Sequence, residues 1–493
     1  MKHRIQRTFP ASVLLCALIA ASACGGEAAA EPTDTKAAAP AEETEAATEK
    51  LVYHADYLPD VSYGGYAFRL VGYEEYPGDI ETETGNLIND AVYSRNRTVE
   101  ERYDVKITEK KYSYANFTDV YTSARQSGLA QSDDADLYNL VFSNAYSGVI
   151  EGIIPPASYL PVIDLSQPWY FHAMNDGLNI NGVQLVAYTA FDRTPGGSCL
   201  LFNKKLMAEL DLELPYVMVD NGTWTYDVFY DMAKAGISDL DGDGKMTVAD
   251  RWALAAPIDD ITDFAYYGAG QKLVNFDSSG TPYVSQEEVL FDMFAKALDQ
   301  ISADGFFLNV SAVKGAPTGT SYTSYQLFSE GHSLFAITRT SALVQLGDMA
   351  DDYGVLPYPK WTEDQKMHYN APDGSRIMVP LASSTDLERV CVIKEALAVE
   401  SLNINYPAYY EVSLKNRYVR DEDSVRMLDI ITSGVTYDVG CAMDYNAIRG
   451  PWLNCMEKGK NDFISAVTKN LSKAQKVIDK LLENTEEIKT LYE

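Results

Sequence analysis

Tyr66-Ala-Phe-Arg-Leu-Val-Gly72 is a short apolar run of strand length, and the segments that follow it decide the fold. Residues 86–103 carry apolar side chains at helical spacing, and residues 105–107 return to a strand-like pattern. A second helix is expected over residues 117–125 and a third strand over residues 136–142. Strands that alternate with helices at this spacing predict an α/β fold with a mainly parallel sheet and right-handed crossovers.

The carboxyl ends of the strands in such a sheet are where ligands usually bind. Tyr73 and Glu75 follow the first expected strand, whereas Asn144 and Tyr146 follow the third. An aromatic ring offers an apolar face, and carboxylates and amides hydrogen-bond polar groups. We therefore expect these four side chains to contribute to a ligand site at one edge of the sheet.

A second structural unit is expected after a turn-rich break. Residues 183–190 have the composition of a strand, and residues 191–197 (FDRTPGG) interrupt the pattern with proline and glycine. A new strand over residues 199–203 and a helix over residues 204–210 follow. The chain is therefore expected to cross from one lobe to another within residues 183–197.

The C-terminal part continues the α/β pattern. Short strands are expected at residues 333–337 and 353–357, on either side of a helix near residues 342–349. Residues 461–490 form a long amphipathic pattern whose polar face carries charges of both signs. This pattern is typical of a terminal helix packed on a protein core rather than of a membrane helix.

The composition narrows the possible partners. The 493 residues include 71 Asp and Glu against 40 Lys and Arg, so the formal net charge is −31. This charge argues against nucleic acid, because affinity for the phosphate backbone depends on Lys and Arg. The 34 tyrosines are numerous; tyrosine suits a ligand surface as well as plain packing.

Cysteine and histidine usage argues against a zinc site. The chain has six cysteines without a C-x-x-C pair, and only five histidines. The state of Cys199, Cys391, Cys441 and Cys455 stays open. A disulfide between Cys441 and Cys455 and free buried thiols are the two alternatives.

The N-terminus has the features of a secretory signal. Three basic residues within Met1–Arg7 precede an apolar run from residue 9 to residue 21, and small residues follow. Ala21-Ser22-Ala23-Cys24-Gly25 resembles a bacterial lipobox, although leucine is usual where Ala21 stands. The resemblance implies a signal peptide over residues 1–23 and lipidation of Cys24, and ordinary cleavage near Ala23 is the alternative.

A flexible tether is expected after the signal. Glu27–Lys50 consists almost entirely of Ala, Glu, Thr, Pro, Asp and Lys, and it lacks aromatic residues. Such a segment cannot bury a core. We place an acidic tether over residues 24–55, which would hold the folded part outside the cell membrane through the lipid anchor alone.

Residues 239–250 (DLDGDGKMTVAD) fit the pattern of a twelve-residue calcium loop. Gly244 stands at position 6, where the chain must turn sharply. Asp replaces the usual Glu at position 12, and only one such loop is found, so we interpret the ion as a structural Ca²⁺ rather than a sensor. The expected ligands are Asp239, Asp241, Asp243, Lys245 (through its carbonyl), Thr247 and Asp250.

Common catalytic motifs are absent from the sequence: it contains no G-x-S-x-G, no H-E-x-x-H, and no G-x-G-x-x-G after a strand. We therefore expect no enzymatic activity. Two alternatives stay open, a surface glycoside hydrolase, because no two carboxylates stand out among many, and a calcium-dependent adhesion module.

Several segments resemble the extracellular solute-binding proteins of ABC importers, of the sugar-binding, maltose-binding-protein-like family (family 1). Leu200-Leu-Phe-Asn-Lys-Lys-Leu206 resembles the family's step into the second lobe, and Gly222-Thr-Trp224-Thr-Tyr-Asp227 resembles its W-T-W-D motif. Phe328-Ser-Glu-Gly331 and Asp352-Tyr-Gly354-Val-Leu-Pro357 resemble two later motifs. The order and spacing of these motifs, rather than any one of them, carry the resemblance.

The resemblance implies a type II periplasmic-binding-protein-like fold, with two lobes that close on a small solute. It implies an N-terminal lobe of residues 56–185 plus 331–372 and a C-terminal lobe of residues 186–330 plus 373–493, and the packing of the last helix on one lobe or the other stays open. The chain would cross between the lobes near residues 183–197, 325–333 and 370–380. The family's members deliver solutes to an ABC transporter permease, so we expect a monomer on the outer face of a bacterial cell membrane.

A carbohydrate is the expected solute, since sugars stack on aromatic rings and hydrogen-bond carboxylates and amides. A peptide is the alternative. Trp452 follows Arg449-Gly-Pro in a turn-rich segment, where a cleft residue would fit. The expected ligand-binding residues are Tyr73, Glu75, Asn144, Tyr146, Asp192, Arg339 and Trp452.

Overall fold

The structure is a computed structural model, and Val52–Glu493 form one compact unit in it. It describes residues 51–73, 82–113, 118–192, 196–313, 323–373, 376–410, 419–443 and 445–493. The expected signal peptide, most of the expected tether, Cys24 and Glu75 lie outside the described residues.

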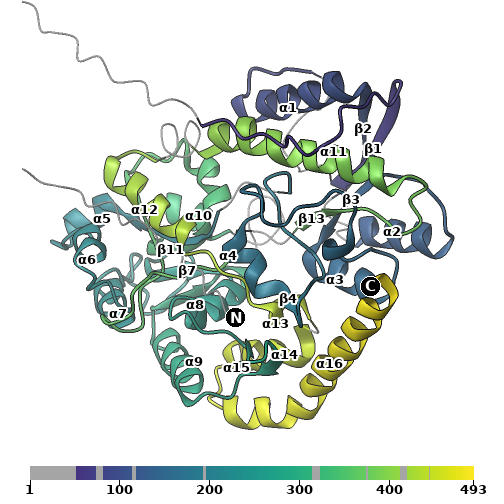
Figure 1. Cartoon of the computed structure of the whole chain (residues 1–493). Helices are drawn as coiled ribbons and strands as arrows, with labels where there is room; N and C mark the ends of the chain where they lie inside the picture. The colour runs from purple at the N-terminus through teal and green to yellow at the C-terminus, as the bar shows by residue number, and fades with distance from the viewer. Residues whose placement is uncertain are drawn as a thin grey trace, which may run out of the picture. The chain divides into compact units, whose positions relative to one another are not determined.

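The first sheet has four strands in the order β13-β3-β1-β2 (Figure 1). β1 (Tyr66–Tyr73) pairs in parallel with both β2 (Val105–Tyr112) and β3 (Leu137–Val141), which confirms the three predicted strands. β13 (Arg376–Val379) runs antiparallel to β3 and was not predicted. The amino end of β13 therefore lies at the same sheet edge as the carboxyl ends of the other strands.

The predicted helices of this part are present. α1 (Leu87–Tyr103) begins after Asn86, whose side chain accepts hydrogen bonds from two backbone N–H groups of the first turn, as a helix cap does. α2 (Asp119–Leu129) lies between β2 and β3 along the chain. α11 (Leu387–Glu400) packs against α1 (Figure 1).

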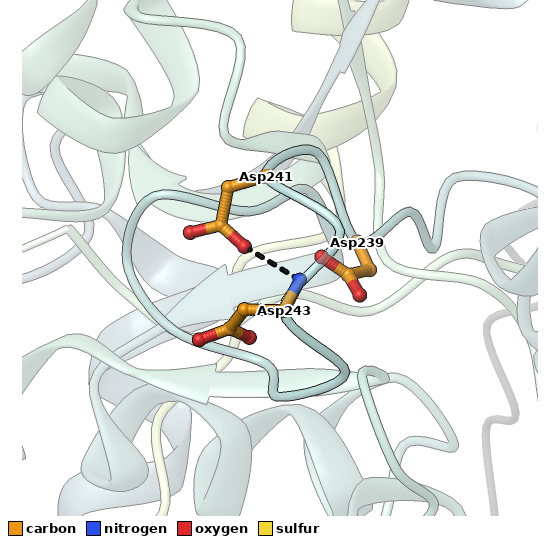
Figure 2. A group of neighbouring side chains, drawn as sticks. All are labelled: Asp239, Asp241 and Asp243. Carbon is orange, nitrogen blue, oxygen red and sulfur yellow. Dashed lines mark hydrogen bonds between the residues drawn. The ribbon is translucent and has the colours of Figure 1, made fainter.

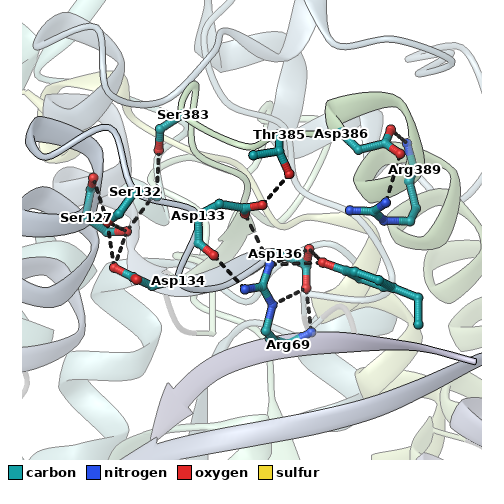
Figure 3. A network of polar contacts seen from close by, with 11 residues as sticks. Arg69, Ser127, Ser132, Asp133, Asp134, Asp136, Ser383, Thr385, Asp386 and Arg389 are labelled. Carbon is teal, nitrogen blue, oxygen red and sulfur yellow. Dashed lines mark hydrogen bonds and ion pairs between the residues drawn. The ribbon is translucent and has the colours of Figure 1, made fainter.

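A polar network ties together the chain segments at the opposite edge of this sheet (Figure 3). Arg69 on β1 forms an ion pair with Asp136, with 3.0 Å between Nε and Oδ2, and donates to the carbonyl of Asp133 at 2.6 Å. Ser383, which follows β13, donates to the carbonyl of Ser132 at 2.8 Å. The members of this network bind one another, so we interpret it as structural.

The second sheet has five strands in the order β10-β7-β11-β6-β12. β10, β7 and β11 are parallel to one another, whereas β6 is antiparallel to both of its neighbours. The strands are β6 (Ser198–Asn203), β7 (Trp252–Ala256), β10 (Phe307–Asn309), β11 (Ser333–Arg339) and β12 (Tyr353–Leu356).

This strand pairing corrects the expected division into lobes. Residues 331–372 were assigned to the N-terminal lobe, but β11 and β12 within them belong to the second sheet. β13 lies within residues 373–493, assigned to the C-terminal lobe, but it pairs in the first sheet. An apolar run predicts a strand but not the sheet that the strand joins, because the choice depends on partners far away in sequence.

The chain passes between the two sheets before β6 and again between β12 and β13. The two passing segments lie side by side: Ser198 donates its N–H to the carbonyl of Ala371 at 2.8 Å, and Asp373 donates to that of Gly196 at 2.9 Å. A third passage leads from α11 to α12 (Glu422–Ser433), which packs against β12. The crossing expected near residues 325–333 is wrong, because β10 and β11 lie in the same sheet.

Two expected elements take another form. Within residues 183–190 only β5 (Val183–Gln184) is a strand, paired with β4 (Asn179–Ile180). The backbone N–H and C=O of Tyr188 instead bond the side chain of Asn175, so Tyr188 needs no partner on a neighbouring strand. The helix expected near residues 342–349 is the 3₁₀-helix η5 (Thr340–Leu346).

Several of the remaining helices pack against strands of the second sheet. The predicted terminal helix is present as α16 (Phe463–Tyr492), and no helix among the described residues has the length and apolar character of a membrane span. Cys199, Cys391, Cys441 and Cys455 are free thiols. The other elements are α3 (Phe142–Ile150), η2 (Ala157–Tyr159), α4 (His172–Asn175), η3 (Asp176–Leu178), α5 (Lys204–Glu209), α6 (Tyr216–Asp220), α7 (Tyr226–Lys234), α8 (Ile258–Tyr267), β8 (Val274–Phe276), β9 (Pro282–Val284), α9 (Glu288–Ile301), η4 (Val310–Ala312), α10 (Ser324–Ser329), the π-helix η6 (Ser401–Asn405), α13 (Val439–Ala442), α14 (Tyr445–Ile448) and α15 (Gly450–Lys458).

Candidate functional site

The carboxyl edge of the first sheet carries an aromatic ring and a cation. Tyr73 ends β1 and is fully buried. The guanidinium of Arg376, the first residue of β13, lies 4.2 Å from the centre of the Tyr73 ring, a cation–π distance. Asn144 is half-buried in α3, which begins directly after β3. The structure thus places Tyr73 and Asn144 at the predicted edge.

Tyr146 lies in an aromatic cluster rather than on an open surface. It stacks on Phe142, with 6.4 Å between the ring centres, and burial raises the pKa of its phenol. Phe142 also stacks on Tyr188 at 5.5 Å and packs on Tyr437, from the segment after α12, at 4.7 Å. This aromatic cluster therefore connects the carboxyl edge of the first sheet to the segment after α12, which contains Tyr437.

The carboxyl edge of the second sheet carries an ion pair. Arg339 ends β11, and its Nη2 lies 2.9 Å from Oδ1 of Asp260 in the first turn of α8. The Arg339 side chain is 45% exposed, whereas that of Asp260 is 7% exposed. Burial raises the pKa of the Asp260 carboxyl, and the nearby Arg339 partly offsets that rise. Arg339 therefore offers charged donors to solvent from a fixed position.

A second arginine at this edge was not predicted. Arg449, 4% exposed in its side chain, donates to the carboxylates of Asp259 and Asp263 in α8 at 2.7 and 2.8 Å. Asp259 and Asp260 lie in the first turn of α8, which follows β7, and Asp263 lies about one turn further along the helix. Three carboxylates just after a strand are a sequence signal that could have identified this cluster.

Trp452 packs in the core, in contrast to its expected place on the surface of a cleft. Pro451 stands in the first turn of α15, and the Trp452 ring packs into the core, where it is 1% exposed. It lies 4.3 Å from Phe294, 5.0 Å from Phe291 and 5.8 Å from Phe463, between ring centres. At the start of α15, Trp452 therefore points into the core, whereas Arg449 lies beside α8.

Asp192 is likewise structural. It is 1% exposed and accepts hydrogen bonds from the backbone N–H groups of Thr189 at 2.7 Å and Met378 at 2.5 Å. Asp373 lies in the segment that leads from β12 to β13, and it fixes that segment in the same way. Its carboxylate accepts hydrogen bonds from the N–H and the hydroxyl of Ser341, at 2.7 and 3.0 Å. The two aspartates anchor the segments that connect the sheets.

The structure brings together three of the predicted calcium ligands at the tip of one loop (Figure 2). Asp239, Asp241 and Asp243 are exposed, and one carboxylate oxygen of each lies within 4.8 Å of the others. Asp239 accepts from the N–H of Gly244 at 2.8 Å, and Gly244 has a φ of +78°, which favours glycine. The loop is thereby held in a tight turn around the carboxylates.

Asp250 and Thr247, two further expected calcium ligands, lie at the base of the loop and contact other residues of the loop. Asp250 is fully buried, and its oxygens accept from the N–H groups of Leu240 and Thr247, each at 2.8 Å. The Thr247 hydroxyl also donates to Asp250, at 3.1 Å. These two side chains close the base of the loop, and the N–H of Lys245 donates to Asp243 at 2.8 Å.

No protein family model matches this chain, and no curated protein matches it in sequence. Solved structures share the fold of this chain, and they include a maltose/maltodextrin-binding domain and an ABC substrate-binding protein. A maltose/maltodextrin-binding domain from Bdellovibrio bacteriovorus bound to maltotriose is 14% identical with a TM-score of 0.53, covering 84% of this chain and 100% of its own.

Two further structures share the fold. An ABC substrate-binding protein from Listeria monocytogenes in complex with cycloalternan is 10% identical, with a TM-score of 0.54, and the match covers 84% of this chain and 99% of the other. UgpB from Mycobacterium tuberculosis in complex with glycerophosphocholine is 14% identical, with a TM-score of 0.58, and the match covers 85% of this chain and 99% of the other.

Proposed function

We propose that this chain is an extracellular, lipid-anchored solute-binding protein, which captures a small carbohydrate between its lobes and delivers it to an ABC transporter permease. The observation that carries this proposal is the fold, which this chain shares over 84% of its length with a maltotriose-bound domain. In such open α/β sheets, ligands bind beyond the carboxyl ends of the strands.

The charged groups at those ends support a polar solute. Arg339 and Asp260 in the second lobe, and Arg376 and Asn144 in the first, are able to hydrogen-bond hydroxyl groups. A solute that contacts both lobes stabilises their closed arrangement by population shift. This role requires no covalent step, and we propose that the chain is not an enzyme.

A thermal-shift screen tests the proposal, with maltotriose, cycloalternan and a peptide library, each with and without calcium. A ligand at 100 times its dissociation constant stabilises the fold by about 2.7 kcal/mol, which is a readily measured shift. A chromogenic glycoside panel runs in parallel. Sugar release from that panel would support the hydrolase alternative and contradict the binding role.

A phosphodiester solute is the second candidate. The structure with the TM-score of 0.58 is in complex with glycerophosphocholine. Arg339 and Arg376 offer the guanidinium groups that phosphate oxygens bind well. Glycerophosphocholine therefore belongs in the same screen, and stabilisation by this solute but not by sugars would favour the second candidate.

We propose that the loop of residues 239–250 holds a structural Ca²⁺. Asp239, Asp241 and Asp243 supply three hard carboxylate ligands, and calcium takes six to eight oxygens, so backbone carbonyls and water would complete the shell. The loop is joined at its base by the paired backbones of Ser238 and Arg251, at 2.9 and 3.0 Å. An ion at the tip would therefore stabilise the entry to β7.

We also propose lipid attachment through Cys24 after removal of residues 1–23. The proposal is supported by the lipobox-like sequence and by the polar segment after it. The test is expression of the full chain with Cys24→Ser, followed by separation of membrane and medium. Cys16→Ser, within the segment that would be removed, is the matched control and should leave the protein in the membrane fraction.

A further inference from the structure

The terminal helix α16 is long enough to reach from one lobe to the other. Its 30 residues correspond to about 45 Å at 1.5 Å per residue. At its start, Phe463 is 1% exposed and packs against Phe294 of α9 and Trp452 of α15, at 5.4 and 5.8 Å between ring centres. α15 packs on α8, which directly follows β7, so this end of α16 is fixed to the second lobe.

The other end of α16 contacts a different part of the chain. The Tyr492 ring stacks on Tyr159 in η2, with 4.9 Å between the ring centres and 15° between the planes. The Tyr159 hydroxyl donates to the carboxylate of Glu493 at 3.3 Å. About two turns earlier in α16, Glu486 accepts a hydrogen bond from Asn181, in the turn between β4 and β5.

These partners belong to a platform, which we define as residues 153–185. Within it, Ala157 donates its N–H to the carbonyl of Leu185 at 3.0 Å, and Gln184 donates to the Ser158 hydroxyl at 2.8 Å. The carbonyl of Ile153 accepts from Ala382, just after β13, at 2.9 Å. The platform is therefore fixed to the first sheet.

Trp169 gives a second link from the platform to the first lobe. Its Nε1 donates to the buried carboxylate of Glu395, in α11, at 3.0 Å. Because α11 packs on α1 beside the first sheet, the surface under Tyr492 moves with the first lobe. In Figure 1, α16 runs from α15 at one end to the neighbourhood of α3 at the other.

We infer that α16 is a latch between the lobes: its first half moves with the second lobe, and its last two turns hold the platform of the first. Any relative motion of the lobes must then break or shift the Tyr492–Tyr159 stack and the Glu486–Asn181 contact. A stacked aromatic pair at a partly exposed site changes a two-state population ratio by about threefold to tenfold. The inference rests on the two-lobe fold and is independent of the solute.

A distance measurement between the lobes tests the latch without any ligand. Spin labels are attached at Glu101→Cys on α1 and Glu209→Cys on α5, both exposed, and proteins with only one of these two introduced cysteines control for labelling of native thiols. We expect Tyr492→Ala to lower the population at the main interlobe distance by about threefold or more, with a broader distribution. Leu491→Ala is the matched control, because Leu491 is 78% exposed on the same turn, and it should leave the distribution unchanged.

A double-mutant cycle assigns the effect to the stacked pair. Tyr159→Ala should reproduce the change caused by Tyr492→Ala, and the double variant should add little to either. An unchanged distance distribution in Tyr492→Ala, or full additivity of the two single variants, would overturn the latch. Circular dichroism confirms that α16 remains helical, so that a loss of structure is not mistaken for a released latch. If no solute binds this protein, the distance result still decides the inference.

Discussion

Arg339, the last residue of β11, forms an ion pair with Asp260 in the first turn of α8, with 2.9 Å between Nη2 and Oδ1. The pair joins the carboxyl ends of two neighbouring strands, because β7 leads into α8 and pairs with β11. Asp260 is buried and Arg339 is partly exposed. The arginine is thus oriented by one partner while its other donors face outward.

Replacing Arg339 should weaken solute binding more than it weakens the fold. Arg339→Gln removes a charge that is 45% exposed, and the loss of one charge-assisted hydrogen bond lowers affinity by about tenfold. Isothermal titration with the solute found in the screen measures this loss. Lys205→Gln is the control, because Lys205 forms an exposed ion pair on α5, and unchanged binding is expected there. Equal effects in both variants would contradict a role for Arg339 in the site.

The buried Asp438 should make stability depend on pH. Burial raises the pKa of Asp438 to about 6, although three backbone N–H groups, from Leu273, Val274 and Gly440, donate to it. Since its pKa is higher in the folded than in the unfolded chain, the folded state binds more protons between pH 4 and 6. This carboxyl therefore contributes stability that is lost as the pH rises through that window, by at most about 3 kcal/mol.

Asp438→Asn isolates that contribution, because an amide does not titrate. The variant should be less stable than the wild type at pH 4, and the difference should shrink as the pH rises to 7. Urea unfolding at several pH values measures it. A difference in unfolding free energy that stays constant from pH 4 to 7 would show that Asp438 does not titrate in this window.

Calcium removal should lower the melting temperature. A structural ion at 100 times its dissociation constant stabilises the fold by about 2.7 kcal/mol, and chelation removes that contribution. Asp241→Asn should show a reduced response to calcium, because Asp241 belongs to the exposed three-carboxylate group. Asp304→Asn, at another exposed acidic position, should respond as the wild type does. The calcium proposal fails if chelator and added calcium leave the wild-type melt unchanged.

Trp452→Ala should unfold the protein more readily without a specific effect on the solute site. The ring is 1% exposed and packed among three phenylalanines. Removing such a side chain costs about 3–5 kcal/mol in unfolding free energy, and Trp452→Phe should recover part of it. Affinity measured well below the melting temperature should stay near that of the wild type. If the well-folded Trp452→Phe variant lost much of its affinity for the solute, Trp452 would have to be counted among the solute-binding residues.

Local patterns predicted the first sheet well. The apolar run at β1, the helical spacing of α1 and the next apolar runs are properties of neighbouring residues, and the structure confirms them. The sheet that β11 joins could not be predicted in the same way, since its apolar residues would suit either core. That choice is made by pairing with β6 and β7, strands far away in sequence.

The candidate site was predicted only in part, for a related reason. Tyr73, Asn144 and Arg339 lie at the carboxyl ends of strands or directly after them. Ligands usually bind at these ends in parallel sheets, so the sequence pattern was sufficient to predict their position. Trp452 and Arg449 are three positions apart, and only the orientation of α15 puts the tryptophan in the core and the arginine beside α8. Sequence does not show that orientation, although the aspartates after β7 could have been identified by the same strand-end rule.

The most direct test of the binding role is isothermal titration of the purified protein with maltotriose, cycloalternan and glycerophosphocholine, followed by analysis of each mixture for products. We expect saturable binding of one carbohydrate molecule per chain, with the solute recovered intact. The absence of binding heat for every sugar, or the recovery of a cleaved sugar, would contradict it.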